Sequence, residues 1–425
     1  MKETMENADK IWDVVVIGGG PAGMMAAGRA SELGAEVLLL EKNDSLGKKL
    51  LITGGGRCNL TNAEPDVRKF LSKFKDSDKF LFSPFSQFGV QESLDFFHSR
   101  GMETKVEALG RVFPASNSAQ SVWNTLLEYL KANNVSIRSN CPVTGFEKSE
   151  NKITAVVLKN AKKIESKIYA RKFILATGGK SRPETGSTGD GFEWLKTIGH
   201  TVVEPSVALV PVTTSDAWVK RLQGVSMSEV KITLLQNEIK QDAKVGKILF
   251  THFGVSGPTI LNMSRDIGEL LKYGEVVISL DLLPHLDHGQ LNTELQKIFA
   301  ENDKKKIKNV LDVLVPSAVA PIILELAEIN SDTACNSVTR ENRMTLIKIL
   351  KGMQIHPTGL LGEDKAVITS GGISLDEVDF KTMSSKLFPN LYVVGDILNI
   401  DRPTGGYGLQ LCWTSGYVAG TNTSA

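Results

Sequence analysis

The sequence has few cysteines and no close pair of them. Its four cysteines are scattered along 425 residues, with no CxxC or CxxxxC spacing: Cys58, Cys141, Cys335 and Cys412. The sequence therefore predicts no disulfide framework, zinc site or redox dithiol. It also lacks an apolar run near the roughly 20 residues that a membrane-spanning helix needs, and its polar start lacks a signal-peptide pattern. A membrane is not an expected partner, and the cytoplasm is the expected location.

Charge of one sign is missing as well, because 49 Lys and Arg residues face 48 Asp and Glu residues. A near-neutral chain creates no general field for nucleic acid, so nucleic acid is not an expected partner. Two basic runs, at 159–163 and 304–308, are interpreted as solvated surface. The length favours two or three domains, and the sequence leaves the oligomeric state open.

A dinucleotide-binding pattern opens the chain at residues 12–42, which read as a buried strand, a Gly-rich turn, a helix of small residues and a second buried strand. The turn motif, GxGxxG with one alanine inside it, comprises Gly18, Gly20, Ala22 and Gly23. Its first glycine allows the tight turn, the second lets the backbone approach a pyrophosphate, and the third lets the helix pack on the strand. Glu41 ends the second strand, where a carboxylate can accept hydrogen bonds from ribose hydroxyls. An acid there disfavours a 2′-phosphate, so the expected ligand is FAD or NAD.

Three later segments favour FAD over NAD. Thr177 and Gly178 follow a buried strand, where small residues let the chain pass close to a dinucleotide. Gly395 and Asp396 end another strand, where an acid suits the ribityl chain that NAD lacks. The Gly-rich stretch 403–420 opens a helix whose positive end would face the N1–C2=O edge of a flavin and stabilise its reduced form.

The pattern of apolar residues divides the chain. Residues 1–205 and 356–425 have the buried strands of a Rossmann-type FAD domain, whereas 206–288 alternate like the strands of a small β-barrel and 289–355 are mostly helix-patterned. The predicted fold class is α/β, a Rossmann-type FAD-binding domain with an inserted β-barrel and helical subdomain. Within the FAD domain the pattern predicts helices near 65–74, 90–100 and 118–134, antiparallel strands at 135–160, and a buried strand at 366–374.

The loop GKKLLITGGGRCNLTN, residues 47–62, is the most distinctive stretch. It resembles the signature of the BaiN-like, aminoacetone-oxidase-like family of flavoproteins in the glutathione-reductase/fumarate-reductase superfamily. The resemblance continues at 176–200, 205–212, 247–261, 366–398 and 405–410, and so spans nearly the whole chain. It implies an FAD domain interrupted by a barrel and a helical subdomain. It also implies that FAD is surrounded by Lys42, Lys49, Gly54, Arg57, Cys58, Asn59, Val143, Gly178, Asp396, Gly406, Leu409 and Gln410.

The residues of the loop suit flavin contact on physical grounds too. Three consecutive glycines expose N–H groups, and Arg57 adds charge near the pyrophosphate or the pyrimidine edge. Asn59 can hydrogen-bond the N3–H and O4 groups of the ring. Two segments depart from the family pattern: 181–183 lacks an aromatic residue before proline, and 399–408 lacks the Asn that usually follows the Tyr. The resemblance therefore does not extend to the substrate.

Flavin supplies hydride chemistry, so the protein needs to add orientation and one proton donor. His252 ends a barrel strand before a glycine turn, and Tyr407 lies in GGYG; both are candidate catalytic donors. The alternatives are a surface or packing histidine and an aromatic ring that only packs on the flavin. The remaining histidines considered have no carboxylate or cysteine at metal-ligand spacing, so no metal is predicted: His285, His288 and His356.

The sequence thus predicts an FAD-dependent oxidoreductase that transfers a hydride between a small organic substrate or NAD(P)H and the flavin. No second GxGxxG in strand context occurs, so NAD(P)H would bind only transiently as electron donor. Two alternatives stay open: an FAD-containing RNA-modifying enzyme, marked by a basic face, and a non-catalytic flavin redox sensor. The substrate, and the choice among NADH, NADPH and O₂, are not determined by the sequence.

Overall fold

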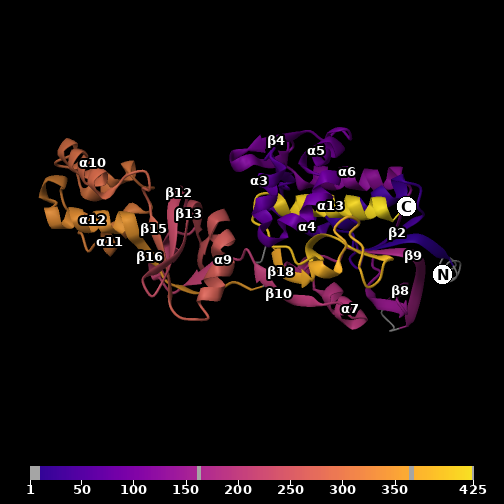
Figure 1. Cartoon of the computed structure of the whole chain (residues 1–425). Coiled ribbons are helices and arrows are strands. Elements are labelled where there is room, and N and C mark those ends of the chain that lie inside the picture. The colour runs from indigo at the N-terminus through magenta and orange to yellow at the C-terminus, as the bar shows by residue number, and fades with distance from the viewer. Residues whose placement is uncertain (1–9, 160–163, 363–367, 424–425) are drawn as a thin grey trace. The chain divides into compact units, whose positions relative to one another are not determined.

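The computed structural model describes residues 10–159, 164–362 and 368–423. The chain divides into two compact units, Met1–Val207 with Ala366–Ala425, and Ala208–Lys365. Each unit has its own hydrophobic core. Figure 1 shows the helices and strands of the chain. Within the described ranges, no helix combines the length and the apolar character that a membrane crossing requires.

The first unit is built on a seven-stranded sheet with a parallel centre. β1 (Ile11–Ile17) pairs in parallel with β2 (Val37–Leu40) and β9 (Glu165–Leu175), and β2 pairs in parallel with β6 (Ser136–Arg138). β19 (Leu391–Val393) adds a parallel pairing to β9. All residues of β2 and β19 are buried, as a parallel sheet covered on both faces requires. The predicted α/β Rossmann class is confirmed.

The sheet continues from β9 through two antiparallel strands. β8 (Lys152–Lys159) pairs with β9, and β7 (Val143–Ser149) pairs with β8 across a turn in which Glu150 has φ 54°. The antiparallel pair predicted at 135–160 is present from Val143 onward. The first part of that stretch, β6, is instead parallel to β2, because residues just after a helix complete the Rossmann crossover.

Helices α1 (Pro21–Glu32) and α13 (Tyr407–Asn422) pack closely in this unit, and Figure 1 shows α13 in yellow with α4 (Asp78–Gln87) and α6 (Ala119–Ala132) labelled nearby. Small residues make this approach possible. A Cβ at Gly420 would lie 2.6 Å from a carbonyl oxygen of α1. The C-terminal helix is therefore fixed on the helix that follows the glycine turn.

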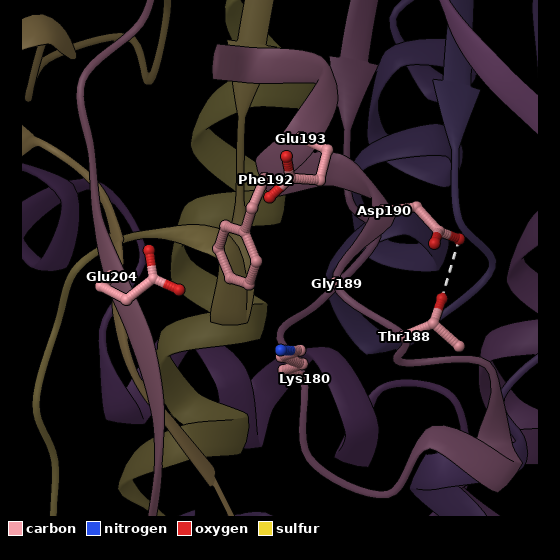
Figure 2. A pocket seen from close by; sticks show the side chains of 7 residues that line it. All are labelled: Lys180, Thr188, Gly189, Asp190, Phe192, Glu193 and Glu204. Atoms are coloured by element: carbon pink, nitrogen blue, oxygen red, sulfur yellow. Dashed lines mark hydrogen bonds between the residues drawn. The ribbon is translucent and has the colours of Figure 1, made fainter. Parts of the chain in front are cut away.

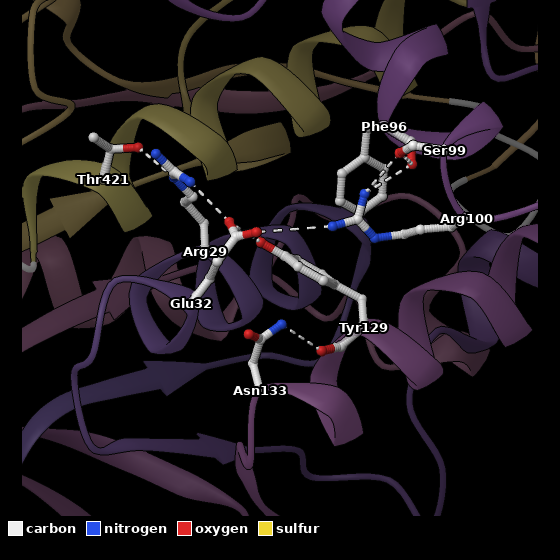
Figure 3. Close-up of polar contacts among 8 residues, drawn as sticks. All are labelled: Arg29, Glu32, Phe96, Ser99, Arg100, Tyr129, Asn133 and Thr421. Carbon is white, nitrogen blue, oxygen red and sulfur yellow. Dashed lines mark hydrogen bonds and ion pairs between the residues drawn. The ribbon is translucent and has the colours of Figure 1, made fainter.

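A polar cluster joins the far ends of these helices (Figure 3). Glu32 accepts hydrogen bonds from Arg29 at 2.8 Å and from the Tyr129 hydroxyl at 2.9 Å. Arg29 also donates to Thr421 at 3.0 Å, and Arg100 lies 3.9 Å from Glu32. Because these residues come from α1, α6, α13 and the loop after α5 (Val90–His98), the cluster ties four segments together.

Two predicted helices, α5 and α6, lie at the expected places. The helix predicted near 65–74 is shorter, since α3 (Val67–Leu71) passes into a 3-10 turn at Ser72–Ser77. The sequence pattern did not predict α4, which contains Pro84, a residue that usually ends a helix. Of the strand predicted at 366–374, residues 366 and 367 lie outside the described part. The other elements of the unit are α2 (Lys48–Ile52), β3 (Thr61–Asn62), β4 (Thr104–Glu107), β5 (Arg111–Pro114), α7 (Asp190–Ile198), β10 (Val202–Ala208) and β18 (Ile368–Ile373).

The second unit contains a seven-stranded antiparallel sheet in the order β16-β15-β12-β13-β14-β11-β17. Buried and half-buried residues alternate along its strands, for example along Val276–Asp281, as in strands with one face in the core. The strands are β11 (Val212–Thr214), β12 (Ser226–Gln236), β13 (Ile239–Phe250), β14 (Gly254–Ser256), β15 (Val276–Asp281), β16 (Met353–Ile355) and β17 (Pro357–Leu360).

This sheet returns on itself at His356. β16 and β17 stand at the two ends of the strand order, yet only His356 separates them in the chain. The stretch 353–360 therefore pairs with β15 at its beginning and with β11 at its end, which closes the sheet.

Helices cover the second unit's sheet. α9 (Pro258–Leu270) packs on β13, and α12 (Arg340–Gly352) packs on β15 and on α10 (His288–Glu301) and α11 (Ala320–Leu326). Figure 1 shows α10, α11 and α12 gathered at one end of this unit. The short helix α8 (Ala217–Arg221) precedes β12. The division of this unit into a barrel at 206–288 and a helical subdomain at 289–355 stays a prediction.

Candidate FAD site

The glycine turn after β1 has three glycines with different surroundings. Gly18 has φ 104°, and a Cβ there would lie 2.5 Å from the carbonyl oxygen of Ala176. A Cβ at Gly23 would overlap the carbonyl oxygen of Gly18. Gly20, by contrast, has no protein atom within 4 Å of such a Cβ. Two of the glycines are thus required by the protein's own packing, whereas Gly20 borders open space at the start of α1.

Glu41 holds this turn from the end of β2. It is 7% exposed, and its Oε2 accepts the backbone N–H of Gly19 at 2.8 Å. Its Oε1 accepts the backbone N–H and the side-chain amide of Asn43, both at 2.8 Å. A carboxylate offers about four lone-pair sites, so one remains for a ribose hydroxyl. Glu41 therefore also has a structural role that the motif did not reveal.

The segment just before the predicted residue Val143 is hydrogen-bonded to the backbone of Glu41 and Asn43. The N–H of Cys141 donates to the carbonyl of Glu41 at 2.9 Å, and the N–H of Asn140 donates to the carbonyl of Asn43 at 2.8 Å. Val143 is buried at the start of β7, two residues later. The strand ends around Glu41 are therefore joined into one edge.

Lys42 forms a pair that the sequence did not predict. Its ammonium group lies 2.9 Å from Asp190 and 2.6 Å from the hydroxyl of Thr188. Burial raises the pKa of Asp190, but hydrogen bonds from Lys42 and Thr188 outweigh it and hold that pKa below its ordinary value. Figure 2 shows the hydrogen bond between Thr188 and Asp190 beside a pocket. This bond is 2.8 Å long, and the pocket has a volume of about 170 Å³. Its lining is Lys180, Thr188, Gly189, Asp190, Phe192, Glu193 and Glu204.

Asp396 is enclosed between two cations. The ammonium group of Lys49 lies 3.2 Å from Asp396 and also donates to Ser181 at 2.7 Å. Arg402 forms an ion pair with the other carboxylate oxygen. Burial raises the pKa of Asp396, but the charges of Arg402 and Lys49 keep that pKa below its usual value. Sequence reasoning named Lys49 and Asp396 but missed Arg402.

The glycine loop at 53–59 is fastened to the protein by its later residues. Gly54 has φ 57°. Arg57 lies over the ring of Phe113 at 4.1 Å and pairs with Glu107. Cys58 is fully buried, and burial raises the pKa of its thiol to about 12. In the structure, Arg57 therefore contacts protein groups, and the side chain of Cys58 packs in the core.

Asn59 connects this loop to the beginning of α13. In the amide orientation that satisfies both of its atoms, its oxygen accepts the N–H of Gly406 at 3.0 Å. Its nitrogen donates to the carbonyls of Val112 and Thr61, both at 3.1 Å. Backbone groups thus engage both ends of the amide, and Asn59 positions the N-terminus of α13.

Three residues of the GGYGLQ motif, Tyr407, Leu409 and Gln410, have different surroundings. The ring of Tyr407 packs 4.7 Å from that of Phe70, and burial raises the pKa of its hydroxyl. Gln410 is fully buried and donates to the carbonyl of Gly89 at 3.0 Å and to Ser93 at 2.7 Å. Leu409 is half-buried against the same core. Gln410 therefore anchors α13 to α5 through its side chain.

Several unpartnered groups in the first unit fit an FAD cofactor. The Thr177 hydroxyl and the Arg402 Nε are buried without hydrogen-bond partners among the described residues. Gly178, with φ 74°, follows Thr177 directly, and Gly20 borders open space. Buried polar groups are normally satisfied, so orphaned ones beside a glycine cradle suit a polar ligand with phosphate and ribityl groups. Bound FAD would supply hydride transfer there.

Two histidines of the second unit differ in how they are held. His252 is exposed on the loop between β13 and β14, with its ring centroid 4.9 Å from that of Phe253. His356 has its Nδ1 3.1 Å from Asp216, which also accepts the backbone N–H of His356 at 2.6 Å. Asp216 therefore secures the seam where the sheet closes. No local sequence pattern indicates this pair, because 140 positions separate the two residues.

A second hidden pair lies in the first unit. His200 has its Nδ1 2.8 Å from Glu377 and its Nε2 3.0 Å from the hydroxyl of Ser385. This order resembles a Ser–His–acid triad. Ser385, however, is 1% exposed and accepts the N–H of Phe388 at 2.9 Å, so its hydroxyl donates to His200. These three side chains connect the start of β10 to the loop before β19, and the burial of His200 and Ser385 leaves no access for a substrate.

The parallel sheet, the glycine turn with Glu41 and the fit of the unpartnered groups define an FAD-binding oxidoreductase of the Rossmann class. The family model described as HI0933-like protein Rossmann domain matches residues 12–422, and the chain belongs to this family. The resemblance based on residues 47–62 is thereby confirmed at the level of the family.

Relatives agree with this assignment. A ribosomal RNA dihydrouridine synthase of Escherichia coli (strain K12) is 29% identical over 96% of each chain. A 3-dehydro-bile acid delta(4,6)-reductase of Clostridium scindens is 30% identical over 95% of this chain and 97% of its own. A solved 3-ketosteroid delta1-dehydrogenase of Sterolibacterium denitrificans shares the fold, with a TM-score of 0.54, 13% identity, and coverage of 97% of this chain and 99% of its own.

Proposed function

We propose that this protein is a reductase that saturates a carbon–carbon double bond conjugated with a carbonyl group, with FAD as the hydride donor. The observation that carries the proposal is a reaction shared by two full-length relatives with different substrates. A 3-dehydro bile acid with a Δ4 double bond is an enone, and the C5=C6 bond of uridine is conjugated with the C4 carbonyl. Both names therefore describe hydride addition to a double bond that a carbonyl polarises.

The reaction balances with one hydride and one proton. The hydride adds to the carbon β to the carbonyl, and the proton adds to the α carbon, so that the double bond becomes single. NAD(P)H is the proposed electron donor, binding transiently, since the sequence has no second GxGxxG motif in strand context. A cytoplasmic site of action, where NAD(P)H is available, belongs to the same proposal.

The first unit's residues would hold the cofactor. Gly20 would border the pyrophosphate, Glu41 would accept a ribose hydroxyl, and Thr177 would use its unpartnered hydroxyl on the dinucleotide. Asp396, with Lys49 beside it, would bind the ribityl hydroxyls. These groups bind and orient, which brings the hydride donor and the double bond into one geometry.

Tyr407 is the proposed proton donor. A tyrosine hydroxyl is protonated at neutral pH and so has a proton to give, and burial raises the pKa of Tyr407 further. His252 is the alternative named from the sequence. Tyr407→Phe should slow turnover by about 10²–10⁴, the usual worth of general acid catalysis, and leave the flavin spectrum intact. If Tyr407→Phe turns over at the wild-type rate and His252→Ala does not, the donor is the histidine.

A small molecule is the proposed substrate, because a net charge of +1 gives no general attraction to RNA. The second candidate is a uridine of ribosomal RNA, which the name of the Escherichia coli relative favours. Two assays separate them. Purified holoprotein with NADPH is given a 3-oxo-Δ4 steroid, and in parallel unmodified ribosomal RNA, and the saturated products are measured by mass spectrometry. Saturation of the steroid alone supports the first candidate, and dihydrouridine formation alone supports the second.

A further inference from the structure

Arg402 is a buried arginine with one unpartnered hydrogen-bond donor among the described residues. Its side chain has no exposed surface, and it forms an ion pair with Asp396. One Nη donates to the carbonyl of Ile400 at 2.8 Å. Its Nε has no hydrogen-bond partner among the described residues. Buried donors are normally hydrogen-bonded, so the Nε of Arg402 is left for a group that the described residues do not supply.

The carboxylate of Asp396 has two cationic partners. Lys49 and Arg402 both pair with the one carboxylate, and the further partner of Lys49 is the neutral hydroxyl of Ser181. The neighbouring Asp401 accepts a hydrogen bond from Ser370 at 2.7 Å. Asp396 and Lys49 retain 15% and 21% exposure, whereas Arg402 retains none. Arg402 therefore lies behind the carboxylate, where water screens its charge least.

Gly408 explains how the arginine fits. A Cβ at Gly408 would lie 3.1 Å from the Nε of Arg402, so any side chain there would press on the guanidinium. Position 408 is also where this chain lacks the Asn that usually follows the Tyr in the family pattern. Gly408 belongs to the first turn of α13, whose N-terminal end carries about half a positive charge. The guanidinium thus adds a full charge beside a helix end that is already positive.

We propose that Arg402 is a positioning residue that sets the redox balance of the cofactor: it fixes Asp396 as an ionised partner and adds a buried positive charge behind the start of α13, so that the protein prefers the reduced, negatively charged flavin over the oxidised one. This inference rests on the proposed placement of FAD beside Asp396 and α13. The positive N-terminal end of α13 would favour reduced flavin by itself, and this inference assigns a further part of that preference to the side chain of Arg402.

The direction of the effect follows from charge alone. Arg402 helps to keep the pKa of Asp396 low, so its removal leaves a buried carboxylate with one cation instead of two. The site then becomes less positive, and it binds reduced flavin less well relative to oxidised flavin. We expect a tenfold to hundredfold loss of this preference, which corresponds to a midpoint potential lower by about 30–60 mV for a two-electron couple.

The test measures the FAD midpoint potential of the holoprotein by spectroelectrochemistry, without any substrate. Arg402→Met should lower it by the stated amount, and Arg402→Lys, which keeps the charge, should restore most of the difference. Arg171→Met is the matched control, since Arg171 is a surface arginine of the same unit with 77% exposure and should leave the potential unchanged. An Arg402→Met protein with full FAD content and the wild-type potential overturns the proposal.

A second pair of variants covers the case in which Arg402→Met does not fold. Lys49→Met removes the other cation of the group from a more exposed position, and Arg402→Lys keeps the charge. The proposal then requires a lower potential in Lys49→Met and a near-normal one in Arg402→Lys; equal potentials in both overturn it. Enone turnover is assayed separately, so a shifted potential without any enone reduction contradicts the proposed function and leaves this inference standing.

Discussion

The carboxylate of Glu41 accepts the backbone N–H of Gly19 at 2.8 Å, which ties the end of β2 directly to the glycine turn after β1. The two strands are parallel neighbours, so their carboxyl ends meet at one edge of the sheet. Glu41 therefore shapes the turn before any dinucleotide binds and keeps one lone-pair site for the ribose.

Glu41→Gln should weaken FAD binding and also lower stability. The loss of a charged acceptor costs about 1.5–3 kcal/mol, or about tenfold to a hundredfold in affinity for FAD. The N–H groups of Gly19 and Asn43 lose part of their acceptor, so the unfolding temperature should fall as well. Titration of the apoprotein with FAD and a thermal melt measure both effects. Glu36→Gln, at an exposed position in the same unit, is the control; unchanged FAD affinity in Glu41→Gln would show that the ribose lies elsewhere.

Gly20→Ala should weaken FAD binding without changing the stability of the apoprotein. Gly20 has extended backbone angles, φ −78° and ψ −177°, and its Cβ would meet no protein atom within 4 Å. The added methyl group should therefore leave the melting temperature of the apoprotein unchanged but reduce FAD affinity at least about tenfold, since it would occupy pyrophosphate space. Gly23→Ala should instead fail to fold, because its Cβ overlaps the backbone of Gly18. A Gly20→Ala protein that binds FAD with the wild-type affinity would rule out this placement of the pyrophosphate.

Asp216→Asn should lower the stability of the second unit in a pH-dependent way. Burial raises the pKa of Asp216, but hydrogen bonds from His356 and Thr214 bring that pKa below its ordinary value. A depressed pKa contributes stability above the unfolded pKa of about 3.9, and this contribution is lost as the pH falls through the folded pKa.

The free energy of unfolding of the wild type should therefore exceed that of Asp216→Asn by about 1–3 kcal/mol at pH 7. This difference should disappear below a pH of about 4. Denaturant unfolding at several pH values measures this difference. Asp242→Asn, on the half-exposed Asp242–Lys244 pair of the same unit, should show a smaller gap at every pH. A gap that stays constant down to pH of about 2 would exclude ionisation of Asp216 as the cause.

The thiols of Cys58 and Cys412 should be inert in the native protein. Burial raises the pKa of each to about 12, so both stay protonated at pH 8 and present no thiolate to an electrophile. Iodoacetamide labelling followed by mass spectrometry should leave both unmodified, whereas the half-buried Cys141 should react first in this unit. After denaturation all three should react. Early modification of Cys58 or Cys412 would contradict their burial.

Features that depend on neighbouring residues in the chain could be predicted from the sequence. The continuous apolar runs of β1, β2 and β19 predict strands buried on both faces, and the glycine motif predicts the turn between β1 and α1. The family could be identified because its loop at 47–62 is a contiguous signature. Helix α4 was missed, since Pro84 interrupts the pattern on which such predictions depend.

Pairs formed across long stretches of chain could not be predicted. Asp216 with His356, Lys42 with Asp190, and His200 with Glu377 each join distant segments, and neither partner is distinctive alone. Arg402 stands close to Asp396 in sequence, but only the turn before α13 brings its charge against that carboxylate. The sequence names residues that could bind a ligand, and the fold decides which of them the protein itself engages.

The most direct test of the proposed reduction mixes the reduced holoprotein, without oxygen, with a compound that contains a conjugated carbon–carbon double bond. The absorbance of oxidised flavin near 450 nm is followed, and the product is identified by mass spectrometry. We predict rapid reoxidation with one saturated product molecule per flavin, and no reoxidation with the already saturated analogue. Reduced flavin that neither the steroid enone nor uridine in ribosomal RNA reoxidises, while O₂ does, would contradict it.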